Sequence, residues 1–560
     1  MFVRVKTSRN SPRKSVQIVE SVREGKKVRQ RIVRHVGVAM DAEEEGTLRQ
    51  LAEHIKSRML HKRRPGLLPP EQVAETAIEA GRRRGTGGPL PVEDLSRLRE
   101  EHRVISGIHE VYGRIYRDLG LDLVLPAGRQ RMSNRVLYHT VMARIANPDS
   151  KRASVRRLER DFGVHVPLEK VYRMMDRLDD AAIAGMRERV GAHTRSLFPE
   201  PIDLVLFDCT TLFFESTCED TLRAYGYSKD GKHGEVQVLL ALAVTRGGLP
   251  LGYEVFPGNS WEGDSFIPTL RTMHPGTARA VIVADAGMFG KDNLAGLEAL
   301  GCRFVVGARL RNLPKALTGR VLDVSRYRSV PGSDLKVGVF RHGGRRLVVS
   351  WSAKRARKDA HDRRSAVAKL IRRLGKSGTP KQLLGKSGYH RYVRVVGEAS
   401  LEVDEEKVHA AERWDGLHGV VTNLGGVGVR ELFDRYRQLW QVEESFRITK
   451  HDLRVRPVFH WTDRRIRAHL AIAFMAYACV RHLARRVALQ KRPMSPRVIR
   501  EALNDRQCSV LHDPETGKRY VIPSRPSAEA KDIYATLGLD VSDRPYELTA
   551  RGTETKSARA

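Results

Sequence analysis

Cysteine and long apolar runs are both scarce in this sequence. Its cysteines are Cys209, Cys218, Cys302, Cys479 and Cys508. Because they include no Cys-x-x-Cys pair, the sequence favours neither a zinc knuckle nor a disulfide framework, and a reducing, cytoplasmic setting is expected. The longest apolar run, from Leu470 to Val480, is too short to cross a bilayer, and the N-terminus has no apolar core of the signal-peptide kind. We therefore expect no membrane partner.

Negative charge is also in short supply. The chain has 66 Asp and Glu against 100 Lys and Arg, which leaves a net charge of +34 and a pI near 10.3. A surplus this large favours a polyanionic partner, most simply nucleic acid. Because 41% of the 560 residues are apolar, the chain can bury more than one core, and about two to four domains are expected.

Composition and apolar periodicity divide the chain into segments. A helical region rich in arginine, with Arg152, Arg156, Arg157 and Arg160, suggests DNA contact, although such charge is usually a solvated face. A very basic helix is expected over residues 353–374. The expected segments are a β-hairpin and helix (1–62), a basic linker (63–100), the helical, DNA-binding region (101–200), a first core part (201–307), a β-rich insertion (308–430), core helices (431–490), a C-terminal extension (491–546) and a disordered tail (547–560).

Strand and helix signals alternate between residues 201 and 307. Apolar runs separated by turn residues predict three strands, a helix, a strand, a helix and a strand. These elements are Leu204–Phe214, Glu235–Val244, Leu249–Phe256, Asp264–Arg271, Ala280–Ala284, Asn293–Leu300 and Arg303–Val306. This is the order of an RNase H-like sheet. We therefore predict an α/β fold with an RNase H-like core, a β-rich insertion and a mostly helical N-terminal region.

One carboxylate, Asp208, interrupts the first of these strands. Burying a lone charge among Leu, Val and Phe is costly unless something compensates, and a bound cation is one of the few ways. Alternatively, Asp208 lies at a strand end and caps the following turn through Thr210 or Thr211. The strand alone does not decide between these interpretations. A second carboxylate, Asp285, directly follows the strand Ala280–Ala284.

Residues 431–450 are expected to form one strong helix. Tyr436, Glu443 and Lys450 are seven residues apart, so a regular helix places them close to one face. Arg447, four residues after Glu443, shares that face. A structural ladder of ion pairs would explain Glu443 and Arg447. An acid among cations also suits a site that handles phosphate.

Asp208, Asp285 and Glu443 are oxygen ligands of the kind that Mg²⁺ prefers. Two such ions can activate a water or a 3′-hydroxyl and stabilise the leaving oxygen of an in-line displacement. The long interval between Asp285 and Glu443 suits a sheet interrupted by an insertion. These acids are therefore the candidate catalytic and metal-ligating residues.

The sequence resembles the DDE transposases of bacterial insertion sequences, in the branch whose third acid lies within Tyr-x2-Arg-x3-Glu-x6-Lys. Tyr436, Glu443 and Lys450 are in register with this signature. The chain departs from it at Leu439, which stands at the Arg position, with Arg437 and Arg447 nearby as substitutes. Further resemblance lies in the stretches around Asp208 and Asp285 and in Gly226–Asp230, Phe256–Asn259 and Arg456–Val458.

The resemblance implies a transposase that acts on double-stranded DNA. It implies Mg²⁺-dependent nicking, with Mn²⁺ able to substitute, at terminal inverted repeats, and strand transfer to target DNA by a dimer in the nucleoid. By the same resemblance, Tyr436 and Lys450 hold phosphates of the cleaved end, and Arg447 is a candidate for the missing arginine's role. The alternatives are a metal-dependent nuclease or resolvase, a non-catalytic DNA-binding descendant, and a structural or membrane-surface protein, which would leave the internal acids unexplained.

Overall fold

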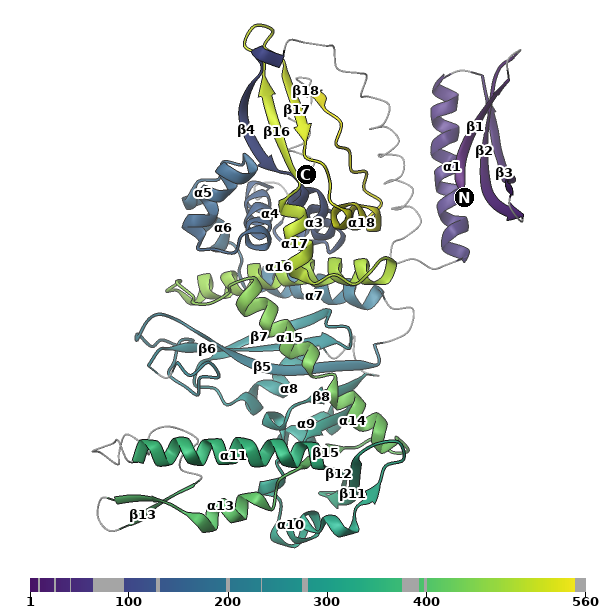
Figure 1. Cartoon of the computed structure of the whole chain (residues 1–560). Helices are drawn as coiled ribbons and strands as arrows, with labels where there is room; N and C mark the ends of the chain where they lie inside the picture. The colour runs from purple at the N-terminus through teal and green to yellow at the C-terminus, as the bar shows by residue number, and fades with distance from the viewer. Residues whose placement is uncertain are drawn as a thin grey trace. The chain divides into compact units, whose positions relative to one another are not determined.

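The computed structural model describes residues 1–8, 11–24, 27–40, 42–63, 95–126, 131–197, 202–232, 234–273, 280–374, 392–396 and 400–548. The chain divides into two compact units, whose elements are labelled in Figure 1. The central unit is Phe198–Phe446. The other, here called the two-segment unit, combines Met1–Leu197 with Arg447–Ala560.

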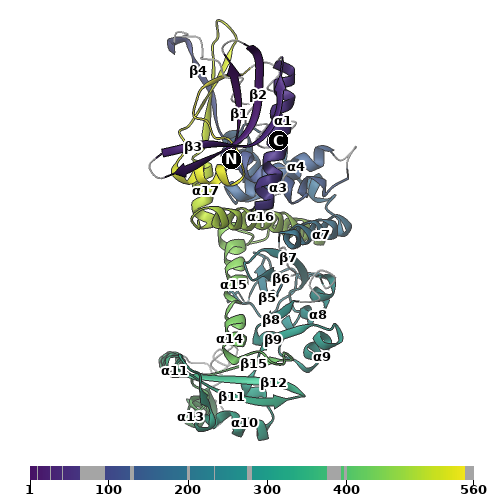
Figure 2. The same cartoon turned by 90° about the vertical axis from the view of Figure 1, so that its right-hand side faces the viewer.

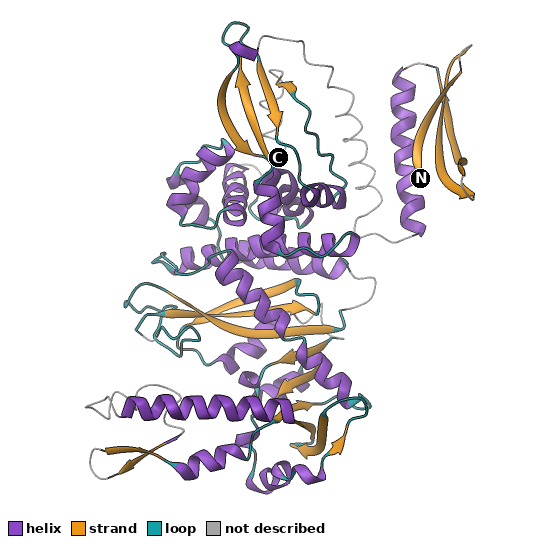
Figure 3. Ribbon diagram, in the orientation of Figure 1, coloured by secondary structure: helices purple, strands orange, loops and turns teal. Residues whose placement is uncertain are grey.

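A nine-stranded sheet forms the core of the central unit (Figure 3). Its spatial order is β10-β11-β12-β15-β9-β8-β5-β6-β7. β8 is parallel to both β5 and β9, and the other neighbours are antiparallel. The part β7-β6-β5-β8-β9 has the predicted RNase H-like order, so the fold prediction is confirmed. These five strands are β5 (Leu204–Phe213), β6 (Gln237–Thr245), β7 (Pro250–Pro257), β8 (Val281–Ala284) and β9 (Arg303–Gly307).

Helices cover both faces of this sheet, as Figure 2 shows. On one face lie α8 (Glu262–Met273) and α9 (Lys291–Ala299). On the other lie α14 (Val429–Arg437) and α15 (Trp440–Arg447). Because both faces are covered, the central strands are apolar along nearly their whole length, without the alternation of a half-exposed strand.

The insertion after β9 continues the same sheet. Its last strand pairs with β9, with Val421 opposite Val306, and its other sheet strands follow outward from there. The expected basic helix forms over the predicted range as α11, and two further helices accompany the strands. The elements are α10 (Lys315–Leu322), β10 (Arg328–Ser329), β11 (Leu335–His342), β12 (Arg345–Ser352), α11 (Ala353–Leu374), β13 (Val393–Val396), β14 (Ser400–Val403), α13 (Glu405–Glu412) and β15 (Leu417–Thr422).

The two-segment unit begins with an antiparallel sheet and a helix. Val16 and Ile18 of the middle strand are buried against Ala52 of the helix. The elements are β1 (Phe2–Ser8), β2 (Ser11–Glu24), β3 (Lys27–Ala39) and α1 (Ala42–Arg63). Most of the linker expected over residues 63–100, namely 64–94, lies outside the described residues.

The rest of this unit is mainly helical. The long helix α16 is buried along most of its length, including Ile466, Leu470 and Phe474. No helix in the described part of the chain is long and apolar enough to span a bilayer. The helices are α3 (Gly107–Asp118), α4 (Arg131–Ala146), α5 (Lys151–Phe162), α6 (Leu168–Met175), α7 (Asp180–Ser196), α16 (Asp463–Gln490), α17 (Pro496–Asn504) and α18 (Ala528–Thr536).

A second sheet in this unit joins distant parts of the chain, in the order β18-β17-β16-β4. Val104 of β4 lies opposite Cys508 of β16. The sequence predicts linker and helix at β4, and this prediction is wrong. Residues 99–105 form a strand because they pair with β16, a distant partner that the local, charged sequence does not indicate. Residues 547 and 548, which the sequence assigns to the disordered tail, belong to β18, and the rest of the expected tail, 549–560, lies outside the described residues. The strands are β4 (Arg99–Ile105), β16 (Gln507–His512), β17 (Arg519–Pro523) and β18 (Tyr546–Leu548).

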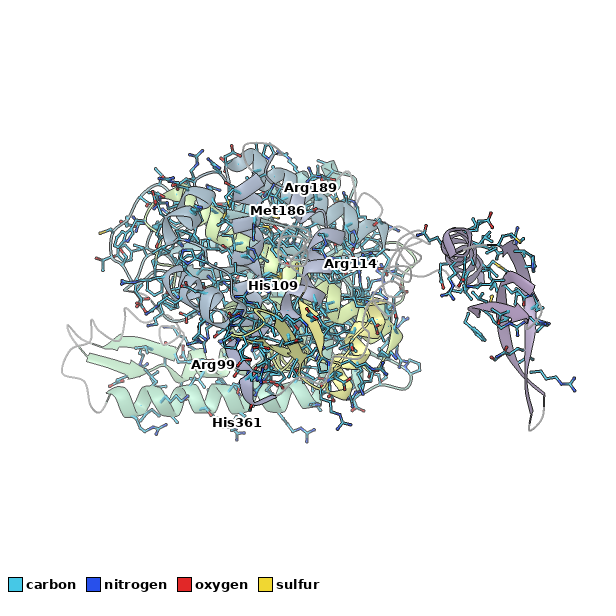
Figure 4. The ribbon with its side chains drawn as sticks, turned by 90° about the horizontal axis from the view of Figure 1, so that it is seen from above. Arg99, His109, Arg114, Met186, Arg189 and His361 are labelled. Atoms are coloured by element: carbon cyan, nitrogen blue, oxygen red, sulfur yellow. The ribbon has the colours of Figure 1, made fainter. Side chains whose placement is uncertain are left out.

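A buried ion pair ties α3 to α16. Arg486 Nη1 lies 2.6 Å from Asp118 Oδ2, and the two side chains are 2% and 6% exposed. Arg114, labelled on α3 in Figure 4, contacts the other oxygen of Asp118 at 3.0 Å. A charge at this depth is tolerated only while its partner is present.

We expect Asp118→Asn to lower the free energy of unfolding by about 3–5 kcal/mol, because the buried Arg486 would lose its main counter-ion. Glu501→Gln is the matched control, since it removes an exposed partner of Arg497 at 2.8 Å on α17. The control should cost less than about 0.5 kcal/mol. Urea unfolding of the full chain measures both changes, and equal losses would contradict a special role for the buried pair.

Candidate functional site

Asp208 lies in the middle of β5, between two residues that face the core. Phe207 packs on Phe266 of α8, with ring centroids 4.7 Å apart, and Cys209 Sγ lies 3.1 Å from Ser265 Oγ of the same helix. Because side chains alternate along a strand, Asp208 points to the opposite face, which α14 and α15 cover. Since β5 continues beyond Asp208, the alternative of a strand-end cap is wrong.

The ammonium of Lys229 lies between two carboxylates. Its Nζ is 3.6 Å from Asp208 Oδ1 and 2.9 Å from Glu262 Oε1, and it donates a hydrogen bond to the Cys209 carbonyl at 2.6 Å. Glu262 is the first residue of α8. The sequence pattern does not single out Lys229 or Glu262 as site residues. Its one signal for them is the position of Lys229 inside the Gly226–Asp230 stretch.

The pKa values of this group show a site crowded with negative charge. Burial raises the pKa of Asp208 to about 7, the carboxylates of Asp285 and Glu262 add to the rise, and Lys229 opposes it. Burial alone would lower the pKa of Lys229, but the surrounding carboxylates outweigh burial and raise it. Lys229 therefore stays charged, and the crowded acids favour a further cation.

Asp285 lies just past the end of the neighbouring strand, at the level of Asp208. β8 runs parallel to β5 with Ala284 opposite Phe207, so the residue that follows each of them is an acid, Asp208 within β5 and Asp285 directly after β8. This register between β5 and β8 places Asp208 and Asp285 near each other. It also explains why Asp285 contributes to the raised pKa of Asp208.

The turn that carries Asp285 is held from two sides. Asp285 Oδ1 accepts a hydrogen bond from the Gly287 N–H at 2.7 Å. Arg309, in the segment after β9, donates from Nε to the Ala286 carbonyl at 2.8 Å and from Nη2 to the Gly287 carbonyl at 3.0 Å. The Asp285 carboxylate is therefore placed by a fixed backbone.

The single helix predicted over residues 431–450 is wrong. α14 ends at Arg437 and α15 begins at Trp440, with the Leu439 N–H bonded to the Tyr436 carbonyl at 3.1 Å between them. A π-helical turn, η8 (Ile448–Asp452), follows α15. The break contains neither Pro nor Gly and accompanies burial of Leu439, which is 8% exposed. The seven-residue spacing therefore does not define one regular helical face.

The predicted site residues are divided between the two units. The central unit holds Asp208, Asp285, Tyr436 and Glu443. Arg447 ends α15 and is 3.3 Å from Asp452, and Lys450 lies in η8. Both cations belong to the two-segment unit. Leu439, at the signature Arg position, is a core residue.

Tyr436 is coupled to all three predicted acids. Burial raises the pKa of its phenol above the ordinary value. Asp285, Asp208 and Glu443 add to this rise, whereas Arg355 of α11 opposes it. The hydroxyl therefore stays protonated at neutral pH, and it can act as a hydrogen-bond donor.

A cleft of about 700 Å³ is lined by Asp285 and Tyr436 on the core side. The insertion lines it with Arg355, Arg311 and Trp414, and the Arg311 guanidinium lies 6.0 Å from the centroid of the Trp414 ring. Guanidinium groups bind phosphate and an aromatic ring stacks on bases. The cleft therefore combines the two chemistries that a nucleic-acid strand requires.

The described residues contain no set of three or more Asp, Glu, His or Cys side chains close enough to hold one metal ion. Asp208 and Asp285 nevertheless supply a pair of hard oxygen donors, next to the side-chain ammonium of Lys229. This donor chemistry fits a hard divalent cation such as Mg²⁺ and lacks the nitrogen or sulfur ligands that Zn²⁺ or Cu²⁺ prefer.

Two family models match the chain. Residues 199–479 match a transposase DDE domain. Residues 3–64 match the IS1634 family transposase N-terminal domain. A search of curated proteins finds no match.

Gly307 tests the packing of Tyr436 against the Asp285 turn. An added Cβ would lie 2.5 Å from Tyr436 Oη and 2.7 Å from the Ala286 amide nitrogen. We expect Gly307→Ala to destabilise the chain by about 1–3 kcal/mol, the usual cost of overpacking. Gly425→Ala is the matched control, because an added Cβ there meets no described atom within 4 Å. Urea unfolding measures both variants, and identical midpoints would contradict close packing of Tyr436 and Ala286 against Gly307.

Proposed function

The chain belongs to the DDE transposases of bacterial insertion sequences, and we propose that it cuts the terminal inverted repeats of its element and joins the freed ends to target DNA. The observation that carries the proposal is the placement of Asp208 in β5 and of Asp285 directly after the parallel strand β8, within the matched domain. A net charge of +34 suits double-stranded DNA.

We propose Asp208, Asp285 and Glu443 as the ligands of Mg²⁺, with Mn²⁺ as a substitute. When bound, these ions would supply Lewis-acid activation of the nucleophile and stabilisation of the leaving oxygen. Asp208 and Asp285 are supported by their register and by the contribution of Asp285 to the raised pKa of Asp208. Glu443 is supported by its position in the signature and by its electrostatic coupling to Tyr436.

The reaction that this family membership suggests has two phosphoryl transfers. In the first, water attacks a phosphodiester at the element end, and the 3′-oxygen leaves with a proton as a 3′-hydroxyl. In the second, that hydroxyl gives up its proton and attacks a phosphodiester of the target, and the target's own 3′-oxygen leaves with a proton as a new 3′-hydroxyl. Rigid placement of Asp208 in β5 and of Asp285 by its braced turn would position the reacting groups.

We further propose that Tyr436, Arg447 and Lys450 hold phosphates of the cleaved end. Tyr436 is supported by its protonated hydroxyl beside the acids. Since Leu439 is buried in the core, the arginine of the signature must be replaced from elsewhere. Arg355 is a second candidate for that role, because it lines the cleft together with Tyr436 and Asp285.

A dimer is the proposed assembly on DNA. An insertion element has two ends, and two copies of one active site can process both. The high positive charge would oppose association of free subunits, and bound DNA would relieve that repulsion.

We expect Asp208→Ala, Asp285→Ala and Glu443→Ala each to reduce cleavage of the element's own ends by roughly 10²–10³-fold or more, because each removes charge stabilisation at the reacting phosphate. Binding of uncut ends should change little. Asp292→Ala, on an exposed part of α9, is the matched control. Nicking assays with Mg²⁺ and Mn²⁺ binding followed by electron paramagnetic resonance measure the effects, and an active Asp285→Ala protein would refute the assignment.

We expect Lys450→Ala to weaken strand transfer from pre-cut ends roughly 10- to 100-fold, the range for a lost charge-assisted hydrogen bond, and to affect the first nick less. Tyr436→Phe should act in the same direction more mildly. Arg447→Ala should be worse than Arg437→Ala, since Arg447 follows Glu443 by one turn of α15, whereas Arg437 lies on α14, before the break at Leu439.

Paired assays of nicking and strand transfer, with a thermal melt of each variant, measure this difference. As surface ion pairs, these cations would contribute only about 0.2–1 kcal/mol to stability. Small and equal losses that follow the melting temperatures would mean that Tyr436, Arg447 and Lys450 have only a structural role. If the unmodified protein nicked the element ends but carried out no strand transfer, the protein would instead be a nuclease.

A further inference from the structure

Two aromatic side chains are exposed immediately before α16. Phe459 is 58% exposed and Trp461 is 63% exposed. Between them, His460 faces the protein, with its ring 5.2 Å from that of His469 and 6.4 Å from that of Tyr172. Phe459 and Trp461 are thus exposed on either side of a residue that faces the protein, and we call them the aromatic pair.

Buried polar groups anchor the segment that carries the aromatic pair. His469 donates from Nε2 to the Val455 carbonyl at 3.0 Å, and Lys151 Nζ lies 3.3 Å from His469 Nδ1. Arg144 donates to the carbonyls of Leu453 and Arg454, at 3.3 and 3.1 Å. Exposure of the pair is therefore a property of a fixed backbone, and the pair is ready to bind without an ordering cost.

The segment that carries the aromatic pair is held at Val458 on one side and at Thr462 on the other. Val458 is 2% exposed, and the Thr462 hydroxyl caps α16 by accepting from the Arg465 N–H at 3.4 Å. The aromatic pair thus stands at the N-terminal, positive end of a long helix.

Arginines follow the aromatic pair in the first turns of α16. Arg464 is exposed. Arg465 forms two hydrogen bonds of 2.7 Å with Asp176 and lies 4.9 Å from the centroid of the Tyr172 ring. The other carboxylate at this helix end, Asp463, is engaged by an arginine on the next turn at 2.7 Å. The local acids are therefore neutralised by pairing, and the positive helix end and Arg464 favour an anion.

We propose that the aromatic pair is a stacking platform for unpaired bases of DNA, with Arg464 on an adjoining phosphate. Exposed aromatic rings next to cationic side chains are the usual means of binding single-stranded nucleic acid, because every base has a π-face and every phosphodiester carries a negative charge. Aromatic residues and arginine are also common in protein interfaces, so the net charge of +34 is what favours DNA as the partner. The platform rests on the proposed function, in which DNA is the substrate, and adds a single-stranded binding site to it.

The test uses the full chain and two probes, a single-stranded oligothymidylate carrying one 2-aminopurine and a duplex of the same length. The double variant Phe459→Ala/Trp461→Ala should bind the single strand roughly 5- to 100-fold more weakly, as expected for one or two lost stacking contacts. It should also lose the quenching of 2-aminopurine fluorescence. Trp440→Ala is the matched control, because Trp440 is another exposed tryptophan at 54%.

Three further variants separate ring stacking from simple apolar contact and from charge attraction. Trp461→Phe keeps a ring and should retain most of the affinity, whereas Trp461→Leu keeps an apolar side chain and should not. Arg464→Ala should reduce the slope of log affinity against log salt by about 0.7, the value for one phosphate contact on a single strand. The double variant should leave that slope unchanged.

Duplex binding and cleavage of element ends should be normal in the double variant, which also shows that it is folded. Unchanged single-strand affinity in the double variant, or full affinity in Trp461→Leu, would overturn the platform. If the unmodified chain bound no duplex and cut no ends, the proposed function would fail instead, so the two failures are distinguishable.

Discussion

The carboxylate of Asp208 is buried in the middle of an apolar strand, and the groups around it compensate for its charge. An isolated buried carboxylate is costly, and the Lys229 ammonium reduces that cost from 3.6 Å away. Glu262 holds the same ammonium from the start of α8. The turn between β5 and β6 and the helix after β7 are thereby both tied to Asp208. A site built this way attracts cations before any substrate arrives.

The insertion contributes to this site because it extends the sheet. β15 pairs with β9, and β9 is next to β8, which ends directly before Asp285. The chain returning from the insertion therefore passes beside the acids, and α11 contributes Arg355 to the cleft shared with Tyr436. A separately folded insertion would not impose this proximity. Continuity of the sheet is thus the physical link between the acids and the basic helix.

Several parts of this protein could be predicted from local sequence. The strands and helices from β5 to β9 follow from apolar runs and turn residues, and Asp208 and Asp285 stand out because charge interrupts or ends those runs. Their adjacency follows from the parallel order of the fold. Lys229 and Glu262 could not be assigned in this way, since their role depends on distances between segments that are far apart in sequence.

Sequence alone determined the composition, the charge of +34, the family signature and the order of elements in the core, because these depend on local pattern. Tertiary structure decided the break at Leu439, which accompanies burial of that side chain and interrupts the face expected from the seven-residue spacing. It also decided that β4 is a strand, since its pairing partner lies some 400 residues away, as the register of Val104 with Cys508 shows. In both places the local pattern is ambiguous or misleading, and long-range packing and hydrogen bonding supply the free energy that selects the conformation.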